Sequence, residues 1–200
     1  MIFSFLQEPL MALVYILSLL YAITIHEFAH AWVSDKLGDP TARLLGRVTL
    51  NPLAHLDPLG TAALLLIGFG WGKPVPFDPF NLENPKRDSA LIALAGPASN
   101  FISIIFAVIA FKLTGILLIV PFIQLNLILG IFNLIPIHPL DGFKIVGGLL
   151  SKHQAEEWYQ LERYGMYFLL FMLLPIVNGQ SLVSRILSPI LDNILRLLLG

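Results

Sequence analysis

Residues 23–32 read ITIHEFAHAW, and the interpretation of the whole chain starts from this stretch. It places His26, Glu27 and His30 in the pattern H-E-x-x-H. These polar residues lie within residues 9–33, a run that is otherwise almost wholly apolar. About 20 apolar residues are enough for a helix to cross the hydrocarbon core of a bilayer. Because ionisable groups at membrane depth are costly and usually functional, the stretch predicts a functional site inside a transmembrane helix.

The composition is that of an integral membrane protein. Of the 200 residues, 56% are hydrophobic and 12% are charged, and the mean hydropathy is +0.80. Soluble domains usually have about 25% charged residues. The net charge of -1 gives no basic field for nucleic acid. The chain has no cysteine, so a metal would be held by His, Asp, Glu or backbone oxygen.

The hydropathy pattern predicts an all-α multipass protein that forms a single membrane-embedded domain over residues 1–200. About four stretches are long enough for full transmembrane helices, namely residues 10–35, 89–111, 115–134 and 158–177. The first lacks a basic start and a small-residue cleavage site, so we expect it to be retained and not removed as a signal peptide. Residues 181–199 are predicted to form a C-terminal amphipathic helix.

Residues 41–80 are predicted to form a re-entrant or β-like membrane-associated segment. Residues 60–71 are apolar but only about twelve residues long, which is too short to span a bilayer. Residues 72–80 read GKPVPFDPF, and the alternating prolines favour an extended edge over a helix. Such an edge could bind an extended peptide as an added strand, and the alternative is a proline-stiffened loop that only caps the site.

The basic residues predict the orientation. If residues 60–71 do not cross the membrane, nine of the 12 basic residues lie on one side. The cytoplasmic side is usually enriched in lysine and arginine. This places the chain in the plasma membrane with His30 toward the cytoplasmic half. The nine are Lys36, Arg43, Arg47, Lys73, Lys86, Arg87, Lys144, Lys152 and Arg163; the other three are Lys112, Arg185 and Arg196.

The H-E-x-x-H pattern predicts a metal site. His26 and His30 are four residues apart, so on a helix both imidazoles can reach one metal ion. Glu27 lies about 100° around the helix from His26, which suits a general base acting on water activated by the metal. Nitrogen and oxygen ligands with one open position favour zinc.

A catalytic zinc usually has three protein ligands, so a third must come from elsewhere in the chain. Most other carboxylates lie in polar loops, where solvated surface charges are expected. Asp141 differs because it follows an apolar span and a proline-broken segment, and Gly142 would let the backbone approach the site. Asp141 is therefore the favoured third ligand, and His138 and His55 are the rival candidates.

Two motifs carry a resemblance to a known family, and the first is the H-E-x-x-H pattern described above. The second is Asn133-Leu134-Ile135-Pro136 followed by Leu140-Asp141-Gly142, and two further stretches are Trp71-Gly72-Lys73-Pro74-Val75-Pro76 and Gly96-Pro97-Ala98-Ser99-Asn100. Together with His26-Glu27-Phe28-Ala29-His30 they resemble the site-2 protease family of intramembrane zinc metalloproteases, in its compact microbial branch without PDZ or CBS domains. The chain departs from the second motif at one position, where His138 replaces a proline.

The resemblance implies an intramembrane zinc endopeptidase that cleaves membrane proteins in or near their transmembrane segments. It implies one zinc ion per chain on His26, His30 and Asp141, with Glu27 activating the attacking water. Asn133 and Asn100 would contact the substrate or its oxyanion, or else satisfy backbone and hold helices together.

His138 would support the site from behind the ligands. The expected partners are transmembrane substrates and the lipid bilayer, with no nucleic acid and an undetermined oligomeric state. The alternatives are a non-proteolytic metal-binding or transport protein and an inactive scaffold that binds membrane helices.

Overall fold

The computed structural model describes residues 8–67, 70–175 and 178–200, and omits the side chains of 64–67. The described residues are helical and contain no strand. Two helices are long and apolar enough to cross a membrane, α2 (Pro9–Lys36, 28 residues) and α5 (Pro85–Thr114, 30 residues). The remaining helices are shorter. They are α3 (Thr41–Leu44), α4 (Pro58–Ile67), α6 (Val120–Asn133), α7 (Asp141–Leu149), α8 (Lys152–Tyr159), α9 (Glu162–Leu173) and α10 (Leu182–Leu199).

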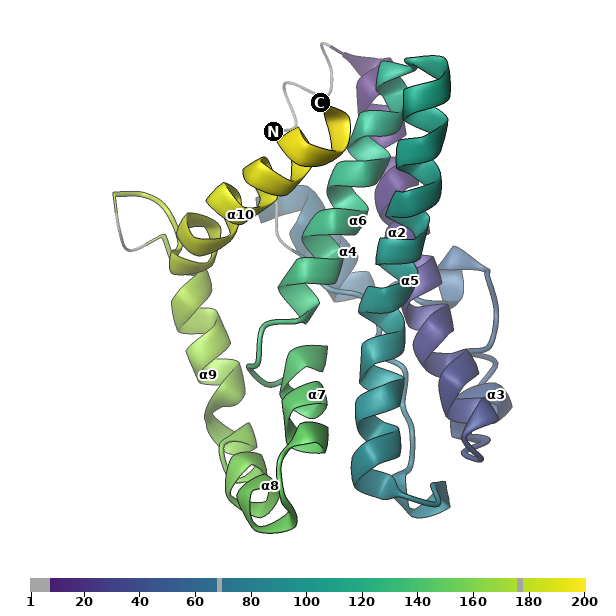
Figure 1. The fold of residues 1–200 in the computed structure, drawn as a ribbon, viewed down its shortest axis with the longest axis vertical. Helices are drawn as coiled ribbons and strands as arrows, with labels where there is room; N and C mark the ends of the chain where they lie inside the picture. Colours follow the sequence, from purple (N-terminus) through teal and green to yellow (C-terminus); the bar gives the residue numbers. More distant parts are fainter. Residues whose placement is uncertain (1–7, 68–69, 176–177) are drawn as a thin grey trace.

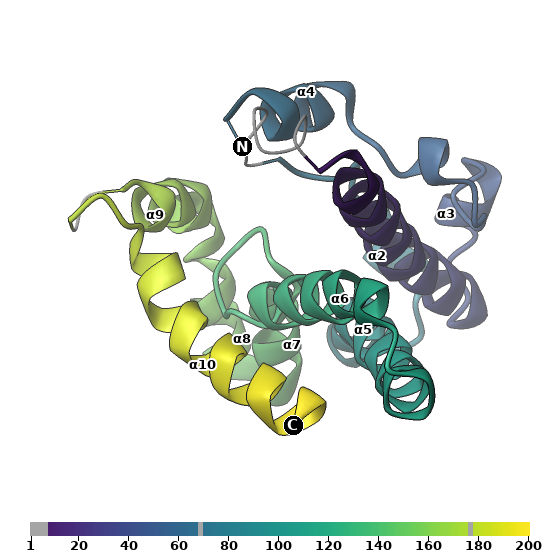
Figure 2. The same cartoon turned by 90° about the horizontal axis from the view of Figure 1, so that it is seen from above.

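The centre of the molecule is a bundle in which α5 packs against α2, α6 and α7. Proline at the first position of α5 suits a helix start, and Gly115 ends the helix in the left-handed conformation. The apolar core lies at one end of the bundle and includes Ile104 and Ile123. α4 lies beside α2, away from α6, whereas α9 and α10 lie beyond α6 (Figure 2).

A break between α6 and α7 brings Asp141 to the bundle. Pro136 and Pro139 prevent a continuous helix here, and α7 begins at Asp141. Gly142 packs directly against the turn, because a Cβ there would lie 2.2 Å from the carbonyl oxygen of Leu134. Gly142 therefore allows the start of α7 to pack against the turn before it.

The β-like prediction for residues 41–80 is wrong for the described part of that segment. It contains α3, α4, two short 3₁₀ helices (Pro52–Ala54 and Pro79–Asn81) and one isolated bridge between Leu56 and Gly72. Two prolines in residues 72–78 remove N–H donors that a strand ladder would need. α4 forms most of the predicted re-entrant piece at 60–71, of which residues 68–69 lie outside the described residues.

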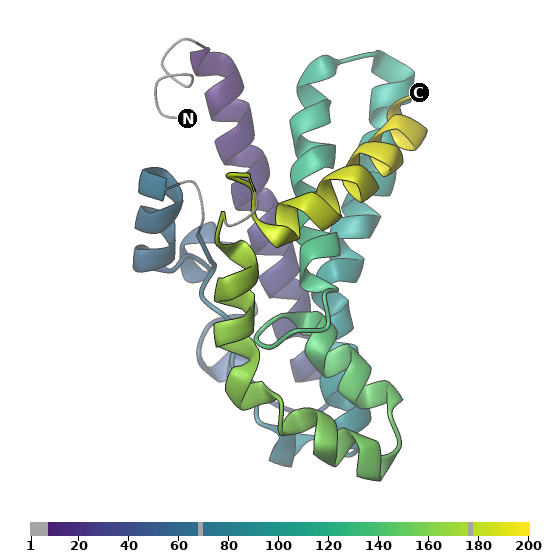
Figure 3. The same ribbon diagram turned by 90° about the vertical axis from the view of Figure 1, so that its left-hand side faces the viewer.

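The predicted fourth span at 158–177 is not one continuous helix. α8 ends at Tyr159, and α9 begins at Glu162 and is only 12 residues long. Residues 176–177 lie outside the described residues. The predicted third span is also shorter than expected, since α6 and the 3₁₀ turn before it cover Leu117–Asn133. α10 matches the predicted C-terminal helix, continues through Pro189 and crosses the bundle obliquely (Figure 3).

Asp39 ties the end of α2 to the residues that lead into α5. Its carboxylate is fully buried and accepts hydrogen bonds from Ser34 Oγ (3.0 Å), Asn81 Nδ2 (2.8 Å) and the backbone N–H of Asp78 (2.8 Å). Burial opposes its ionisation, but hydrogen bonds from Thr41, Asn81 and Asp78 outweigh that effect and lower its pKa to about 2. This contact fixes one end of residues 72–78.

Candidate active site

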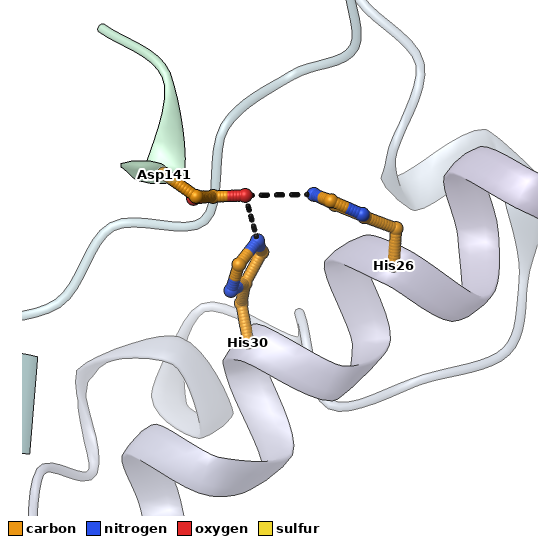
Figure 4. Close-up of side chains that lie close together, drawn as sticks. All are labelled: His26, His30 and Asp141. Carbon is orange, nitrogen blue, oxygen red and sulfur yellow. Dashed lines mark hydrogen bonds and ion pairs between the residues drawn. The ribbon is translucent and has the colours of Figure 1, made fainter. Parts of the chain in front are cut away.

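Three side chains from two helices converge on one point (Figure 4). His26 Nε2 lies 3.1 Å from Asp141 Oδ2, and His30 Nε2 lies 3.2 Å from the same oxygen. The two histidines are buried and project from one face of α2, and Asp141 begins α7. These residues form a group that could hold a metal ion.

The outer ring nitrogens of both histidines are already engaged. His30 Nδ1 lies 2.7 Å from the carbonyl oxygen of Ile92, which can only accept a hydrogen bond. His26 Nδ1 lies 2.6 Å from Asn100 Oδ1. The Asn100 amide orientation follows from its Nδ2, which donates to the carbonyl oxygen of Ala22. A metal ion binds the neutral imidazole, and with these partners on Nδ1 the neutral form of both histidines carries its proton on Nδ1 and presents the Nε2 lone pair.

This protonation pattern leaves electron pairs facing one another. In that neutral form His26 Nε2 and His30 Nε2 lie 3.1 and 3.2 Å from one carboxylate oxygen of Asp141, and neither nitrogen can donate a hydrogen bond to it. A cation between them removes the repulsion. Zinc–ligand bonds of about 2.0–2.1 Å in a tetrahedron separate the ligand atoms by about 3.3 Å, close to the separations found here. The donor set therefore fits zinc.

Gly96 on α5 has no side chain, and this leaves room beside the Nε2 atoms of His26 and His30. A Cβ at this position would lie 2.4 Å from His30 Nε2 and 2.6 Å from His26 Nε2. Real Cβ contacts are essentially never this close. A side chain at residue 96 would therefore displace the imidazoles or occupy the place of the ion.

Glu27 points toward residues 72–75 and not toward α5. Its Oε2 accepts a hydrogen bond from the backbone N–H of Val75 (3.2 Å) and lies 4.0 Å from Arg47 Nη2. Gly72 lies close by, since a Cβ there would be 3.8 Å from Glu27 Oε1. The predicted base is thus adjacent to the ligands in sequence but is held by a different part of the chain.

The rival ligands lie elsewhere. His55 is fully buried, and its Nε2 donates to the carbonyl oxygen of Thr49 (2.8 Å). His138 Nδ1 lies 3.5 Å from Glu162 Oε1 on α9, and its ring meets the Phe143 ring edge to face. The predicted supporting role of His138 is therefore corrected, because its described contacts are with α9 and Phe143.

The two predicted substrate-binding asparagines have other partners. Asn100 is fully buried, and its Nδ2 also donates to Asn126 Oδ1 (3.0 Å). With its oxygen on His26 and its nitrogen on two acceptors, Asn100 orients a ligand and has no donor left for a substrate. Asn133 Nδ2 donates to the carbonyl oxygen of Leu129 on its own helix (3.0 Å). These contacts agree with the alternative that the sequence left open, in which the amides satisfy backbone groups and hold helices together.

Three further residues at the site were not singled out from the sequence. Asn126 is an amide inside an apolar helix, so the reasoning applied to His26 would have found it. Arg47 had been counted only for orientation. Gly96 belongs to a quoted motif, but a glycine in a sequence does not reveal what it faces.

The comparisons with known proteins agree with this geometry. The sequence profile of Peptidase family M50 matches residues 114–176, which include Asp141 but not the H-E-x-x-H pattern. YwhC of Bacillus subtilis is 38% identical over 96% of this chain and 94% of its own length.

The chain belongs to peptidase family M50.

More distant members agree. Rip2 of Mycolicibacterium smegmatis is 28% identical over 80% of this chain and 66% of its own length. MJ0392 of Methanocaldococcus jannaschii is 28% identical over 74% of this chain and 38% of its own length. MJ0392 is named a zinc metalloprotease, and YwhC and Rip2 carry that name provisionally. Zinc is therefore the metal of this family, and no solved structure matches the chain.

Proposed function

We propose that the protein is an intramembrane zinc endopeptidase that cleaves membrane proteins in or near their transmembrane segments. The observation that carries the proposal is the convergence of two imidazole nitrogens, from a helix long enough to span a membrane, with one carboxylate oxygen from α7. Family M50 and the names of its members supply the reaction class. His26, His30 and Asp141 are the proposed ligands of one zinc ion.

Glu27 is the proposed general base. Zinc, when bound, supplies a Lewis acid that polarises the scissile carbonyl and acidifies water. Glu27 takes the proton from the attacking water and returns it to the leaving amine. The Val75 N–H donates to the Glu27 carboxylate, and the Arg47 guanidinium lies beside it. Asn100 and Ile92 keep the imidazole protons away from the ligand atoms.

Residues 72–78 are the proposed docking site for an unwound substrate. Peptide bonds of a helix are protected by hydrogen bonds, so a substrate must be extended before it is cut. The segment is extended, without regular structure, and reaches from the base to α7, where Lys144 Nζ lies 4.4 Å from the Phe77 ring centroid. An extended peptide could add to its backbone groups as a strand.

We place the active site in the cytoplasmic half of the plasma membrane. α2 ends and α5 begins at the end of the molecule where α8 lies (Figure 1). The basic residues near these termini are Lys36, Lys86, Arg87 and Lys152, whereas Lys112 lies near the opposite end of α5. The positive-inside rule then puts the end with α8 in the cytoplasm. Catalytic water would enter from that side.

Co-expression with a single-span substrate tests the proposal. We expect the wild-type chain to cleave and Glu27→Gln to lose activity by at least about 10²–10⁴-fold, the usual contribution of a general base. Zinc should remain bound to Glu27→Gln and be lost from Asp141→Ala. Asp35→Asn is the matched control, because Asp35 is also a carboxylate on α2 but pairs with Arg43 near the surface.

Each result has a clear meaning. Cleavage by Glu27→Gln at the wild-type rate would exclude Glu27 as the base. Zinc retained by Asp141→Ala would move the third ligand elsewhere. Zinc bound by a wild-type chain that cleaves no single-span substrate would favour a non-proteolytic metal-binding protein or a scaffold.

A further inference from the structure

Arg47 is a buried cation that contacts both the base and the segment over it. It lies in the chain between α3 and the 3₁₀ turn Pro52–Ala54, and its side chain is 5% exposed. Nη1 donates to the carbonyl oxygen of Pro74 (3.0 Å), and Nη2 donates to that of Lys73 (2.6 Å). Nη2 also lies 4.0 Å from Glu27 Oε2. One guanidinium thus holds two consecutive carbonyls and faces the carboxylate of the proposed base.

His55 contacts both Arg47 and the backbone of Lys73. Its Nε2–H donates to Thr49, so its Nδ1 is the acceptor that faces Arg47 Nη2 at 3.5 Å. Its backbone oxygen accepts a hydrogen bond from the N–H of Lys73 (2.8 Å). His55 therefore contacts both the guanidinium and the segment that the guanidinium holds.

The effect of these contacts reaches Glu27 through Val75. Val75 follows the two held carbonyls directly, and its N–H donates to Glu27 Oε2. Its neighbours Pro74 and Pro76 have no N–H to offer. A displacement of this short segment would therefore remove the backbone donor from the base.

Stability alone does not account for the burial of Arg47. A buried cation is costly unless it is well paired, and replacing such groups by apolar ones is often neutral or stabilising. Within the described part of the chain, Nε of Arg47 is buried without a hydrogen-bond partner. Burial also lowers the pKa of Arg47, and only the charge of Glu27 opposes that effect. The contacts of Arg47 with the carbonyls of Lys73 and Pro74 and with the Glu27 carboxylate account for a buried cation at this position.

We propose that Arg47 is a positioning residue for the hydrolysis, which fixes the Lys73–Val75 backbone so that Glu27 is held between the Val75 N–H and the guanidinium. The inference rests on the proposed function and names the group that orients its base. It requires the planar fork of arginine, because a lysine ammonium cannot span two carbonyls in one fixed geometry. Arg47 should therefore control turnover and leave zinc binding unchanged.

The test compares Arg47→Lys and Arg47→Met in the full chain, purified in detergent. Arg43→Lys and Arg43→Met are matched controls, because Arg43 is a nearby arginine whose side chain is 63% exposed. We expect Arg47→Met to lower kcat by about 10²-fold, the scale of a small misplacement in an active site. Zinc affinity should stay within about threefold, since the ligand contacts remain. Arg47→Lys should fall between Arg47→Met and the wild type.

Hydrogen exchange gives a readout that does not depend on cleavage. The amides of residues 72–78 should exchange about tenfold faster in Arg47→Lys and Arg47→Met, the scale of one or two lost hydrogen bonds. The amides of α5 should be unchanged. If exchange is faster in the Arg47 variants but the wild-type chain cleaves no substrate, the contact between Arg47 and the segment is supported and the proposed protease function is contradicted.

Two results would overturn the positioning role. The first is wild-type kcat in a folded Arg47→Lys chain with unchanged exchange at residues 72–78. The second is an equal loss of zinc affinity and kcat, which would make Arg47 a general structural residue. If Arg47→Met does not fold, methylguanidinium added to Arg47→Ala decides the matter. Recovered kcat there, absent in Arg43→Ala, supports positioning, and no recovery contradicts it.

Discussion

The two halves of the candidate site are held in different ways. The metal half consists of His26, His30 and Asp141, whose positions follow from side-chain hydrogen bonds between packed helices. The base half consists of Glu27 and residues 72–78, which Arg47 and Asp39 hold mainly through backbone groups. The metal half is built from helices, whereas the base half depends on a segment without regular structure.

Because the two halves are held differently, we expect zinc affinity and turnover to respond to different substitutions. Changes in the metal half should alter zinc affinity, because the ligand atoms there are fixed by α2, α5 and α7 together. Changes in the base half should alter turnover or stability and leave zinc bound. Residues that break this rule would show that the halves are coupled.

Gly96→Ala should have the largest effect. The new Cβ would lie within 2.6 Å of both ligating nitrogens, so the ion and the methyl group compete for one space. We expect zinc affinity to fall by more than about 100-fold, beyond the usual cost of losing an outer hydrogen bond. Cleavage should fall with it. Competition with a chelator in detergent measures the affinity.

Gly130→Ala on α6 is the matched control. Its Cβ would lie 3.3 Å from the edge of the Phe101 ring, which is tight, and 3.5 Å from Asn100 Cβ, which is an ordinary contact, and no atom of His26, His30 or Asp141 is among its three nearest neighbours. The control should keep wild-type zinc affinity. Unchanged zinc binding in Gly96→Ala would mean that α5 does not close against the ligands as described here.

Asn100→Ala should have a smaller effect on the same property. It removes the acceptor of His26 Nδ1 and leaves Asn126 without its buried partner. We expect a loss of about 10–100-fold in zinc affinity, as for other groups that orient a metal ligand. Asn100→Asp keeps an acceptor for His26 and should recover part of the affinity.

Ser103→Ala on the same helix is the comparison for this change. Its hydroxyl donates to the carbonyl oxygen of Ser99 and contacts Tyr21, with no link to the ligands. An equal loss of affinity in Ser103→Ala and Asn100→Ala would reduce the role of Asn100 to helix packing.

The metal half could be predicted from the sequence because its signals are local. His26 and His30 share a helix face by their spacing, and the proline-broken end of an apolar span singled out Asp141. Both long helices were expected where α2 and α5 lie. The contact of Asn100 with His26 could not be predicted, because the spacing in a chain does not show which side chains meet across two helices.

The base half could not be predicted because it depends on contacts between segments distant in sequence. Arg47 lies 27 residues from Pro74, and nothing in either segment indicates that they meet. The prolines correctly indicated an extended segment, but they also prevent the strand that was expected. The third predicted span corresponds to the shorter helical stretch Leu117–Asn133, and the fourth is divided by a turn between α8 and α9.

Asp39→Asn tests whether the far end of the base half affects only stability. The carboxylate accepts several hydrogen bonds. The NH₂ group of an asparagine would face some of these donors and could not accept from them. We expect the free energy of unfolding to fall by about 1–3 kcal/mol, the cost of a buried polar group left unsatisfied. Zinc affinity should be unchanged, and kcat should fall less than in Arg47→Met.

The pH dependence of unfolding tests whether the ionised carboxylate of Asp39 is what stabilises the fold. The pKa of Asp39 is about 2 in the folded chain, below its ordinary value of 3.8. Its contribution is therefore fully present above pH 3.8 and is lost as the pH falls through about 2. Unfolding of metal-free protein should show the difference between wild type and Asp39→Asn shrinking over this interval. A difference that stays constant with pH would mean that the hydrogen bonds do not select the charged form, and reduced zinc affinity in Asp39→Asn would show that the two halves are coupled through α2.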